Sequence, residues 1–200
     1  MDERTLVERL RNRDEEAFVA LVDRYGGSML RVALSFVRTR AVAEEVVQDA
    51  WLGVLRGIDR FEGRSSLKTW LFRIVANTAK TRGERESRSV PFATVFDEPA
   101  VEPERFFGED HPLYPGGWSS APHEWPAERL EAQEVRAVID GVIAELPPQQ
   151  RQVITLRDVL GCEAEETCNA LGLTEVHQRV LLHRARSRVR RALERYMEGP

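Results

Sequence analysis

The stretch that decides the fold is EAEETCNALGLTEVHQRVLLHRARSRVRRALERY, residues Glu163–Tyr196. Its first part predicts a short helix that stops at Gly172, because glycine readily adopts the left-handed conformation that ends many helices. Thr174 can cap the helix that follows, since its hydroxyl can accept a hydrogen bond from a free N–H of the first turn. A short helix, a glycine turn and a longer basic helix together predict a helix-turn-helix.

The longer helix of this motif is rich in arginine. Its apolar face consists of Leu182, Ala185, Val189, Leu193 and Tyr196. The opposite face consists of Arg184, Arg188, Arg191 and Arg195, while Arg179, His183, Arg186 and Arg190 flank the apolar face. Seven arginines lie between residues 174 and 196, and only Glu175 and Glu194 offset them. A solvated helix normally pairs its arginines with acids one turn away, so the excess favours DNA binding.

The chain as a whole is nevertheless acidic, with a formal net charge of −4, and one segment accounts for this. Residues 89–128 hold eight acidic residues and one arginine, a net charge of −7, so the rest of the chain carries +3. The same residues hold seven of the ten prolines, a density that excludes a continuous helix. We therefore predict that residues 89–130 form a long, acidic, Pro-rich linker between two small domains, 1–88 and 131–200.

The predicted linker is also rich in aromatic residues, which disordered tethers usually lack. These residues are Phe92, Phe96, Phe106, Phe107, Tyr114, Trp118 and Trp125. Two explanations stay open at this point. The aromatic side chains pack locally on either domain, or they belong to an extended segment that docks into a partner.

The N-terminal segment has the apolar periodicity of amphipathic helices. Three stretches carry it: DEEAFVALVDRY (14–25), AEEVVQDAWLGVLRGIDRF (43–61) and SSLKTWLFRIVANTAK (65–80). Gly26 and Gly27 are expected to loosen or end the first helix, and FEGRSS (61–66) is expected to form a turn-rich loop. Both domains are thus predicted to be helical, and the predicted fold class is all-α.

Several function classes find no support in the sequence. No apolar run approaches the roughly 20 residues of a membrane span, and the charged N-terminus has no signal-peptide core, so we expect a cytoplasmic protein without membrane insertion. Phosphate-binding loops, dinucleotide motifs and metal-spaced clusters are missing, so we expect no catalysis, cofactor or metal. Cys162 and Cys168 suit a reducing compartment, and Cys168 is expected in the core of the helix-turn-helix.

Five segments together resemble the extracytoplasmic-function (ECF) sigma factors, the minimal two-domain branch of the sigma-70 family of RNA polymerase specificity subunits. Besides the three N-terminal stretches, they are LPPQQRQVITLRDVLG (146–161) and LLHRARSRVR (181–190), in family order and spacing. The resemblance implies a sigma region 2 helical bundle over 1–88 and a sigma region 4 helix-turn-helix over 131–200. It also implies a protein that binds core polymerase, recognises the −35 and −10 promoter elements and helps to melt the DNA.

The resemblance assigns roles to residues of the N-terminal domain. The helix that docks on the clamp helices of the largest polymerase subunit corresponds to Glu44, Glu45, Gln48, Asp49 and Trp51. The region that captures a flipped −10 base corresponds to Phe61, Gly63, Ser65, Lys68, Trp70, Asn77, Lys80, Arg82 and Arg85. Asn77 would bond the base edge, because an amide both donates and accepts, and the cations would hold the strand backbone. Taken alone, Trp70 suits the core better than a stacking platform, and the carboxylates suit a solvated face.

In the C-terminal domain the resemblance assigns contacts with the −35 element. They are Arg157, Arg179, Val180, His183, Arg184 and Arg186. The implied partners are core polymerase, through its clamp helices and flap region, promoter DNA and an anti-sigma factor, and the linker would thread the polymerase cleft. The segment VHQRVLL (176–182) replaces the commoner GTVKSRL of the family, so the −35 consensus does not transfer.

Two alternatives stand beside this interpretation. A helix-turn-helix regulator that binds an operator without core polymerase would explain the C-terminal half but not SSLKTWLFRIVANTAK. An enzyme with an appended DNA-binding domain would need a nucleophile–base pair or a metal site, which the sequence lacks. The promoter consensus, the inducing signal and the regulator are not encoded in any motif of the chain.

Overall fold

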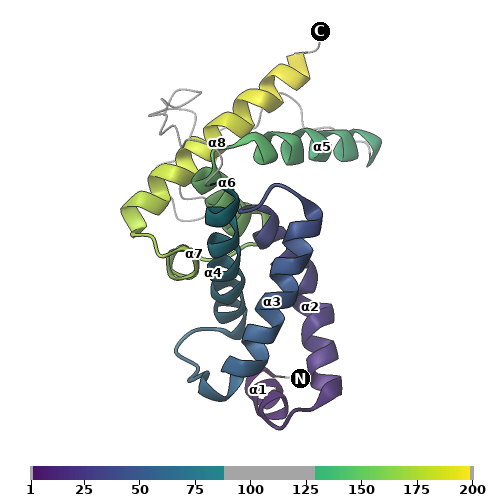
Figure 1. Ribbon diagram of the computed structural model, residues 1–200. Helices are drawn as coiled ribbons and strands as arrows, with labels where there is room; N and C mark the ends of the chain where they lie inside the picture. Colours follow the sequence, from purple (N-terminus) through teal and green to yellow (C-terminus); the bar gives the residue numbers. More distant parts are fainter. Residues whose placement is uncertain (1, 88–128, 199–200) are drawn as a thin grey trace. The chain divides into compact units, whose positions relative to one another are not determined.

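The computed structural model describes residues 2–87 and 129–198, and every regular element in these ranges is helical (Figure 1). The first elements are α1 (Glu3–Arg11), α2 (Glu15–Leu34), α3 (Arg40–Gly57), the 3-10 turn η1 (Ile58–Arg60) and α4 (Leu67–Ser87). The later ones are α5 (Arg129–Glu145), α6 (Pro148–Ile154), the π-helical turn η3 (Thr155–Val159), α7 (Ala164–Leu171) and α8 (Glu175–Glu198). The predicted all-α class is confirmed.

The predicted linker, residues 89–130, lies outside the described residues except at its end. Its last two residues, Arg129 and Leu130, already belong to α5. The seven aromatic residues predicted to pack locally or to dock into a partner all lie outside the described part of the chain. Both explanations of them therefore stay predictions.

The described chain divides into two compact units. The first unit holds residues 2–87 together with 155–175, and the second holds 129–154 together with 176–198. Segment 155–175 belongs by sequence to the predicted C-terminal domain, yet its side chains Leu156, Cys162 and Ala170 are part of the core of the N-terminal helices. The predicted domain boundaries, which follow sequence order alone, stay predictions.

Polar side chains just before the N-terminal helices fix where these helices begin. Asp2, Asp14 and Thr39 each accept a hydrogen bond from a backbone N–H of the first turn, at 2.8, 3.1 and 3.3 Å. Such a cap satisfies a donor that has no partner inside the helix. Asp14 also accepts a bond of 2.6 Å from Arg9 Nε, which, with the bonds from the α2 backbone, lowers the pKa of its carboxyl.

Helices α2, α3 and α4 of the first unit run side by side and bury their apolar faces against one another (Figure 1). Fully buried side chains of this core include Leu21, Met29, Val46, Val54, Leu67, Leu71 and Phe72. Helix α2 continues through Gly26 and Gly27, so the break expected there is wrong. The buried side chains of Leu21 and Met29 hold the helix to the core on both sides of the two glycines.

The second unit contains α5, α6 and nearly all of α8. Pro148 begins α6, as its tolerance in a first helical turn predicts. Buried apolar residues from the three helices form its interior: Val135, Val153, Leu182, Ala185, Val189 and Leu193. Tyr196, predicted on the apolar face of α8, stays 40% exposed, and its hydroxyl donates a hydrogen bond of 2.8 Å to Glu134 of α5.

Candidate polymerase and promoter interface

The side of α3 that faces away from the core is mainly acidic. It carries the four polar residues predicted to dock on polymerase, all exposed: Glu44, Glu45, Gln48 and Asp49. Leu52, one turn beyond Gln48, is 48% exposed and adds an apolar side chain to this face. Leu52 was not among the predicted contacts, because a leucine within an apolar run fits a core equally well. Trp51, the fifth predicted residue, is partly buried and contacts Phe18 of α2 edge-on, with ring centroids 5.7 Å apart.

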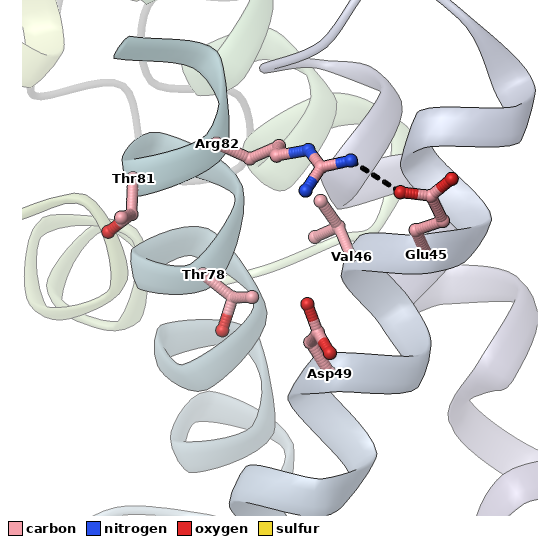
Figure 2. Close-up of a pocket in the computed structure, with 6 residues that line it drawn as sticks. All are labelled: Glu45, Val46, Asp49, Thr78, Thr81 and Arg82. Carbon is pink, nitrogen blue, oxygen red and sulfur yellow. Dashed lines mark hydrogen bonds and ion pairs between the residues drawn. The ribbon is translucent and has the colours of Figure 1, made fainter. Parts of the chain in front are cut away.

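A groove of about 250 Å³ runs between α3 and α4 (Figure 2). Its lining consists of Glu45, Val46, Asp49, Thr78, Thr81 and Arg82. Across the groove, Arg82 Nη2 lies 2.5 Å from Glu45 Oε2. This ion pair joins a residue predicted to bind polymerase to one predicted to hold the −10 strand. The side chains are 41% and 58% exposed, so solvent screens the pair, and we expect it to stabilise the fold by only about 0.2–1 kcal/mol.

Aromatic packing anchors the loop between η1 and α4. Phe61 is 7% exposed, and its ring centroid lies 5.1 Å from that of the partly buried Trp70. Arg11 of α1 donates a hydrogen bond of 2.5 Å to the Phe61 carbonyl. Gly63 has φ +70°, a left-handed conformation that few other residues adopt without strain. Phe61 and Trp70 therefore fix the position of the loop, and Gly63 allows it to turn.

Helix α4 presents a polar, basic side to solvent. Arg73, Asn77 and Lys80 are exposed, and their spacing places them on one side of the helix. Arg73 was not among the predicted −10 contacts, although it precedes Asn77 by one turn. An amide between two cations can bond a base edge while the cations attract phosphates. Arg85 lies in the last turn of α4, and its side chain is outside the described part.

Lys68, a further residue of the predicted −10 set, is directed toward segment 155–171. Its Nζ donates a hydrogen bond of 3.1 Å to the Leu160 carbonyl. The hydroxyls of Ser66 and Thr69, on either side of Lys68, both donate to Glu166 of α7. The start of α4 is thus in contact with another segment of the first unit, a feature that no local sequence pattern indicated.

Helix α7, a turn and helix α8 follow one another as predicted for a helix-turn-helix. Gly172 has φ +67°, and its N–H donates to the Cys168 carbonyl at 2.8 Å, which ends α7. Helix α8 begins three residues later, at Glu175. Cys168, expected in the core, is only partly buried, and the fully buried side chain at this turn of α7 is Thr167.

Helix α8 carries five of the residues predicted to contact the −35 element. All are at least partly exposed: Arg179, Val180, His183, Arg184 and Arg186. Arg190 differs from them, because its side chain is only 3% exposed and its Nε donates to Glu194 at 2.9 Å. At least one arginine of this basic helix is therefore buried and paired within the protein, and is not exposed to DNA.

Arg157, the sixth predicted −35 contact, lies in η3 and points into its own loop. Its Nη1 donates a hydrogen bond of 2.5 Å to the Cys162 carbonyl and lies 4.0 Å from Glu163. The side chain is 17% exposed, and its Nε is buried without a hydrogen-bond partner. In this structure the guanidinium supports the loop between η3 and α7.

Two family profiles match the chain, Sigma-70 region 2 over residues 21–89 and Sigma-70 region 4 over residues 136–195. Over 189 residues, 94% of this chain, it is 31% identical to the RNA polymerase sigma-H factor of Pseudomonas aeruginosa, of which 92% is covered. The chain belongs to the sigma-70 family. Over 83% of its length this sigma factor is also 32% identical to the ECF RNA polymerase sigma-E factor of Escherichia coli K12, of which 81% is covered, so it belongs to the ECF branch.

The fold of this sigma factor also occurs in two solved structures at 22% identity. CnrH, in complex with the cytosolic domain of CnrY, matches with a TM-score of 0.59 over 96% of this chain and 97% of CnrH. The sigma factor RpoE of Bartonella quintana, in complex with the anti-sigma factor NepR, matches with a TM-score of 0.58 over 88% of this chain and 96% of RpoE. At this identity the likeness shows a shared fold.

The family confirms the predicted function class, because an ECF sigma factor binds core polymerase and recognises promoter DNA. The alternative of an operator-binding regulator is not favoured. The roles of single residues stay predictions. Among the described residues, no helix is long and apolar enough to cross a membrane. The same residues contain no group of three or more His, Cys, Asp or Glu side chains placed to hold a metal ion.

Proposed function

We propose that three surfaces of this sigma factor divide the work of promoter opening. The exposed acidic side of α3 binds core polymerase, the loop 61–66 with α4 captures the −10 strand, and α8 reads the −35 element. The observation that best supports this division is the Glu45–Arg82 ion pair across the groove between α3 and α4. It makes the polymerase-binding and strand-binding surfaces neighbours in one packed unit, so a strand held by α4 is also held close to polymerase.

The α3 surface suits a basic partner with an apolar spot. Glu44, Glu45 and Asp49 supply negative charge, and Leu52 supplies an exposed apolar side chain on the same side. Complementary charge speeds encounter and selects the partner, whereas a buried apolar contact supplies much of the affinity. Trp51 contributes indirectly, because its ring packs against Phe18 and holds α3 on α2.

The α4 surface suits a single strand with one base turned out of the stack. Flipping a base costs a few kcal/mol, which contacts with the extruded base must offset. The exposed amide of Asn77 can bond the base edge, and Arg73 and Lys80 flank it to attract phosphates. We assign Phe61 and Trp70 a positioning role, because their rings pack on each other beneath the loop.

The α8 surface suits the major groove of duplex DNA. Arginine can bond guanine bidentately, and an apolar side chain such as Val180 can contact the methyl group of thymine. Arg179 and Val180 are exposed near the start of α8, where recognition helices usually meet base edges. We propose that Arg157 acts on −35 recognition by supporting its loop, because its guanidinium is bonded to the Cys162 carbonyl.

As a specificity subunit, the protein would carry out no chemistry itself, because polymerase supplies the catalytic site. We propose that it works in the cytoplasm, where core polymerase and the chromosome are. We also propose an anti-sigma factor as its regulator. The fold relatives CnrH and RpoE were solved in complex with the cytosolic domain of CnrY and with the anti-sigma factor NepR, respectively.

Run-off transcription with core polymerase on genomic fragments, with mapping of start sites, tests the proposal. Start sites preceded by a shared pair of −10 and −35 sequences are expected, and only when the sigma factor and core polymerase are both present. Specific binding of the same fragments by the chain alone, with no gain on adding core polymerase, would instead support the operator-binding regulator.

A matched pair of variants tests the α3 assignment. Asp49→Ala removes a carboxylate from the proposed polymerase surface, and Asp23→Ala removes a carboxylate from α2 that is also exposed. Asp49→Ala is expected to weaken binding to core polymerase and to reduce its salt dependence, while Asp23→Ala is not. Equal effects of the two substitutions would mean that only the overall charge matters.

A further inference from the structure

Helix α1 lies beside the loop that is proposed to read the −10 element. Both lie at the same end of the first unit, where α3 ends and α4 begins (Figure 1). Leu6, Val7 and Leu10 of α1 are buried in the core of this unit, so the helix is fixed there. The matched Sigma-70 region 2 profile begins only at residue 21, so it assigns no role to α1.

Two charged side chains of α1 hold the two ends of loop 61–66. At the first end, Arg11 donates a hydrogen bond of 2.5 Å from Nη2 to the Phe61 carbonyl and one of 3.4 Å from Nε to the Ile58 carbonyl. At the other end, Glu3 Oε1 accepts the N–H of Leu67, the first residue of α4, at 2.8 Å. This N–H has no acceptor inside its own helix, so Glu3 supplies one. Helix α1 is thus bonded to both ends of the loop.

The turn after α1 is also bonded to η1, the turn that leads into the loop. Arg13 donates from Nη1 to the Leu55 carbonyl at 2.8 Å and from Nη2 to Asp59 Oδ2 at 2.7 Å. Its φ of +59° makes it the one non-glycine residue with a left-handed backbone in the described part of the chain. This conformation is unfavourable for a residue with a side chain, and it persists where surrounding contacts hold it. The chain therefore contains local strain at the point where α1 meets the start of the loop.

The tip of the loop, residues 62–64, stands away from the body of the unit. Glu62, Gly63 and Arg64 are exposed, and a Cβ added to Gly63 would meet no atom within 4 Å. A groove of about 440 Å³ lies between the tip and α1. The position of the tip is therefore set by the two ends of the loop. Bases are recognised through hydrogen bonds with narrow limits of distance and angle, so a shift of the loop changes which base it accepts.

We propose that α1 is a specificity element for the −10 sequence: Arg11 and Glu3 position loop 61–66, and this position determines which base the loop accepts. The inference rests on the proposed function of the loop and α4. Arg11 and Glu3 are positioning residues, because they bond the backbone of the loop and of the start of α4 and need no contact with DNA. Since the bonds are to backbone groups, they hold the loop whatever side chains it carries.

Trypsin cleavage after Arg64 measures how firmly the loop is held in the free chain. Arg64 lies in the exposed tip, and Arg38, exposed in the connection between α2 and α3, is the internal reference. Brief digestion followed by peptide mass spectrometry gives the ratio of cleavage at the two sites. Arg11→Ala is expected to raise the Arg64-to-Arg38 ratio roughly tenfold, because hydrogen bonds from a charged donor are lost. An unchanged ratio would overturn the role of Arg11 in holding the loop.

Run-off transcription by the holoenzyme measures specificity. Each −10 position of a mapped promoter is replaced in turn by the other three bases, and discrimination is the ratio of output between the best and the worst base. Arg11→Ala is expected to lower discrimination roughly tenfold at the position that the loop reads, with binding to core polymerase unchanged. Arg4→Ala is the matched control, because Arg4 is an exposed arginine of the same helix whose Nε lies 3.7 Å from Glu8, and it should leave discrimination unchanged.

A second pair of variants separates the hydrogen bond of Glu3 from its charge. Glu3→Gln keeps an oxygen that can accept the Leu67 N–H, whereas Glu3→Ala removes it. Discrimination should stay near the wild-type value in Glu3→Gln and fall in Glu3→Ala. Equal losses in the two variants would show that only the charge matters, and would overturn the proposal for Glu3. This pair tests the inference even if Arg11→Ala does not fold.

The outcomes distinguish this inference from the proposed function. An Arg11→Ala holoenzyme that loses output equally with all four bases would show that Arg11 acts on stability or on DNA attraction, which overturns the inference while the loop still reads the promoter. A wild-type holoenzyme that transcribes every −10 variant equally well would instead overturn the proposed function of the loop and α4, whatever the tryptic ratio shows.

Discussion

Replacing Trp70 with alanine is expected to lower the free energy of unfolding of the first unit by about 2–3 kcal/mol. The indole packs against Phe61, with ring centroids 5.1 Å apart, and so close to Gly57 that a methyl group there would lie 3.2 Å from the ring. Truncating a fully buried tryptophan costs about 3–5 kcal/mol, and Trp70 is only partly buried, so its loss should cost somewhat less than this range. At about 4–8 °C per kcal/mol, Tm should fall by roughly 10–20 °C.

The assay compares stability with function in three variants. Trp51→Ala is the matched control, because Trp51 is also partly buried and packs on one aromatic ring, but from α3. Trp70→Phe keeps an aromatic ring against Phe61. If Trp70 positions the loop, Trp70→Phe should recover most of the lost stability, measured by urea unfolding, and the run-off transcription should recover with it.

The opposite result would refute the positioning role. A Trp70→Phe variant with wild-type unfolding, wild-type binding to core polymerase and a strongly reduced yield of open complex would show that the indole itself contacts the extruded base. Stacking on a base is worth about 1–3 kcal/mol, so the loss would reach roughly tenfold or more. A Tm of Trp70→Ala within a few degrees of the wild type would refute the packing estimate.

Four further outcomes are expected. Arg184→Ala should reduce −35-dependent run-off transcription several-fold and leave binding to core polymerase unchanged in a pull-down with core enzyme. Asn77→Ala should lower the permanganate reactivity of −10 thymines more than it lowers initial promoter binding, because the amide acts on the extruded base. A double-mutant cycle of Glu45→Ala and Arg82→Ala should give a coupling free energy of about 0.2–1 kcal/mol in urea unfolding, as for an exposed pair. Asp14→Ala should lower Tm at neutral pH. Since the folded-state pKa of Asp14 is lowered, its contribution is present above the unfolded-state pKa and is lost as pH falls through the folded-state value, so the Tm difference should close in acid.

The helices were predictable because their signals are local. Gly172 ends α7 with a left-handed turn, and Pro148 begins α6, each for a reason that a few neighbouring residues contain. The continuity of α2 through Gly26 and Gly27 was not predictable in the same way. Its cause is the burial of Leu21 and Met29 against other helices, and tertiary packing of this kind overrides the weak helix propensity of glycine.

The candidate site likewise contains residues whose placement follows from local sequence and residues whose placement does not. Periodicity alone places Glu44, Glu45 and Asp49 on the outside of α3, so their exposure follows from the sequence. Their pattern alone does not indicate a partner, since a solvated face has the same pattern. The partner is indicated by their correspondence to the polymerase-binding helix of the family. The exposure of Leu52 and the inward direction of Arg157 depend on neighbours far along the chain, which a reading of adjacent residues does not contain.

Glu166 shows why the contact between α7 and α4 could not be inferred from local rules. In the sequence it lies three residues after Glu163, the spacing of a helix cap, and its bond to the Glu163 N–H satisfies that pattern completely. The bonds to Ser66 and Thr69 use the other carboxylate oxygen and cross about a hundred residues. Because the two functions use different oxygens, the cap of α7 does not depend on contact with α4. The start of α7 is therefore fixed by its own residues, and the contact with α4 is added to it by the tertiary fold.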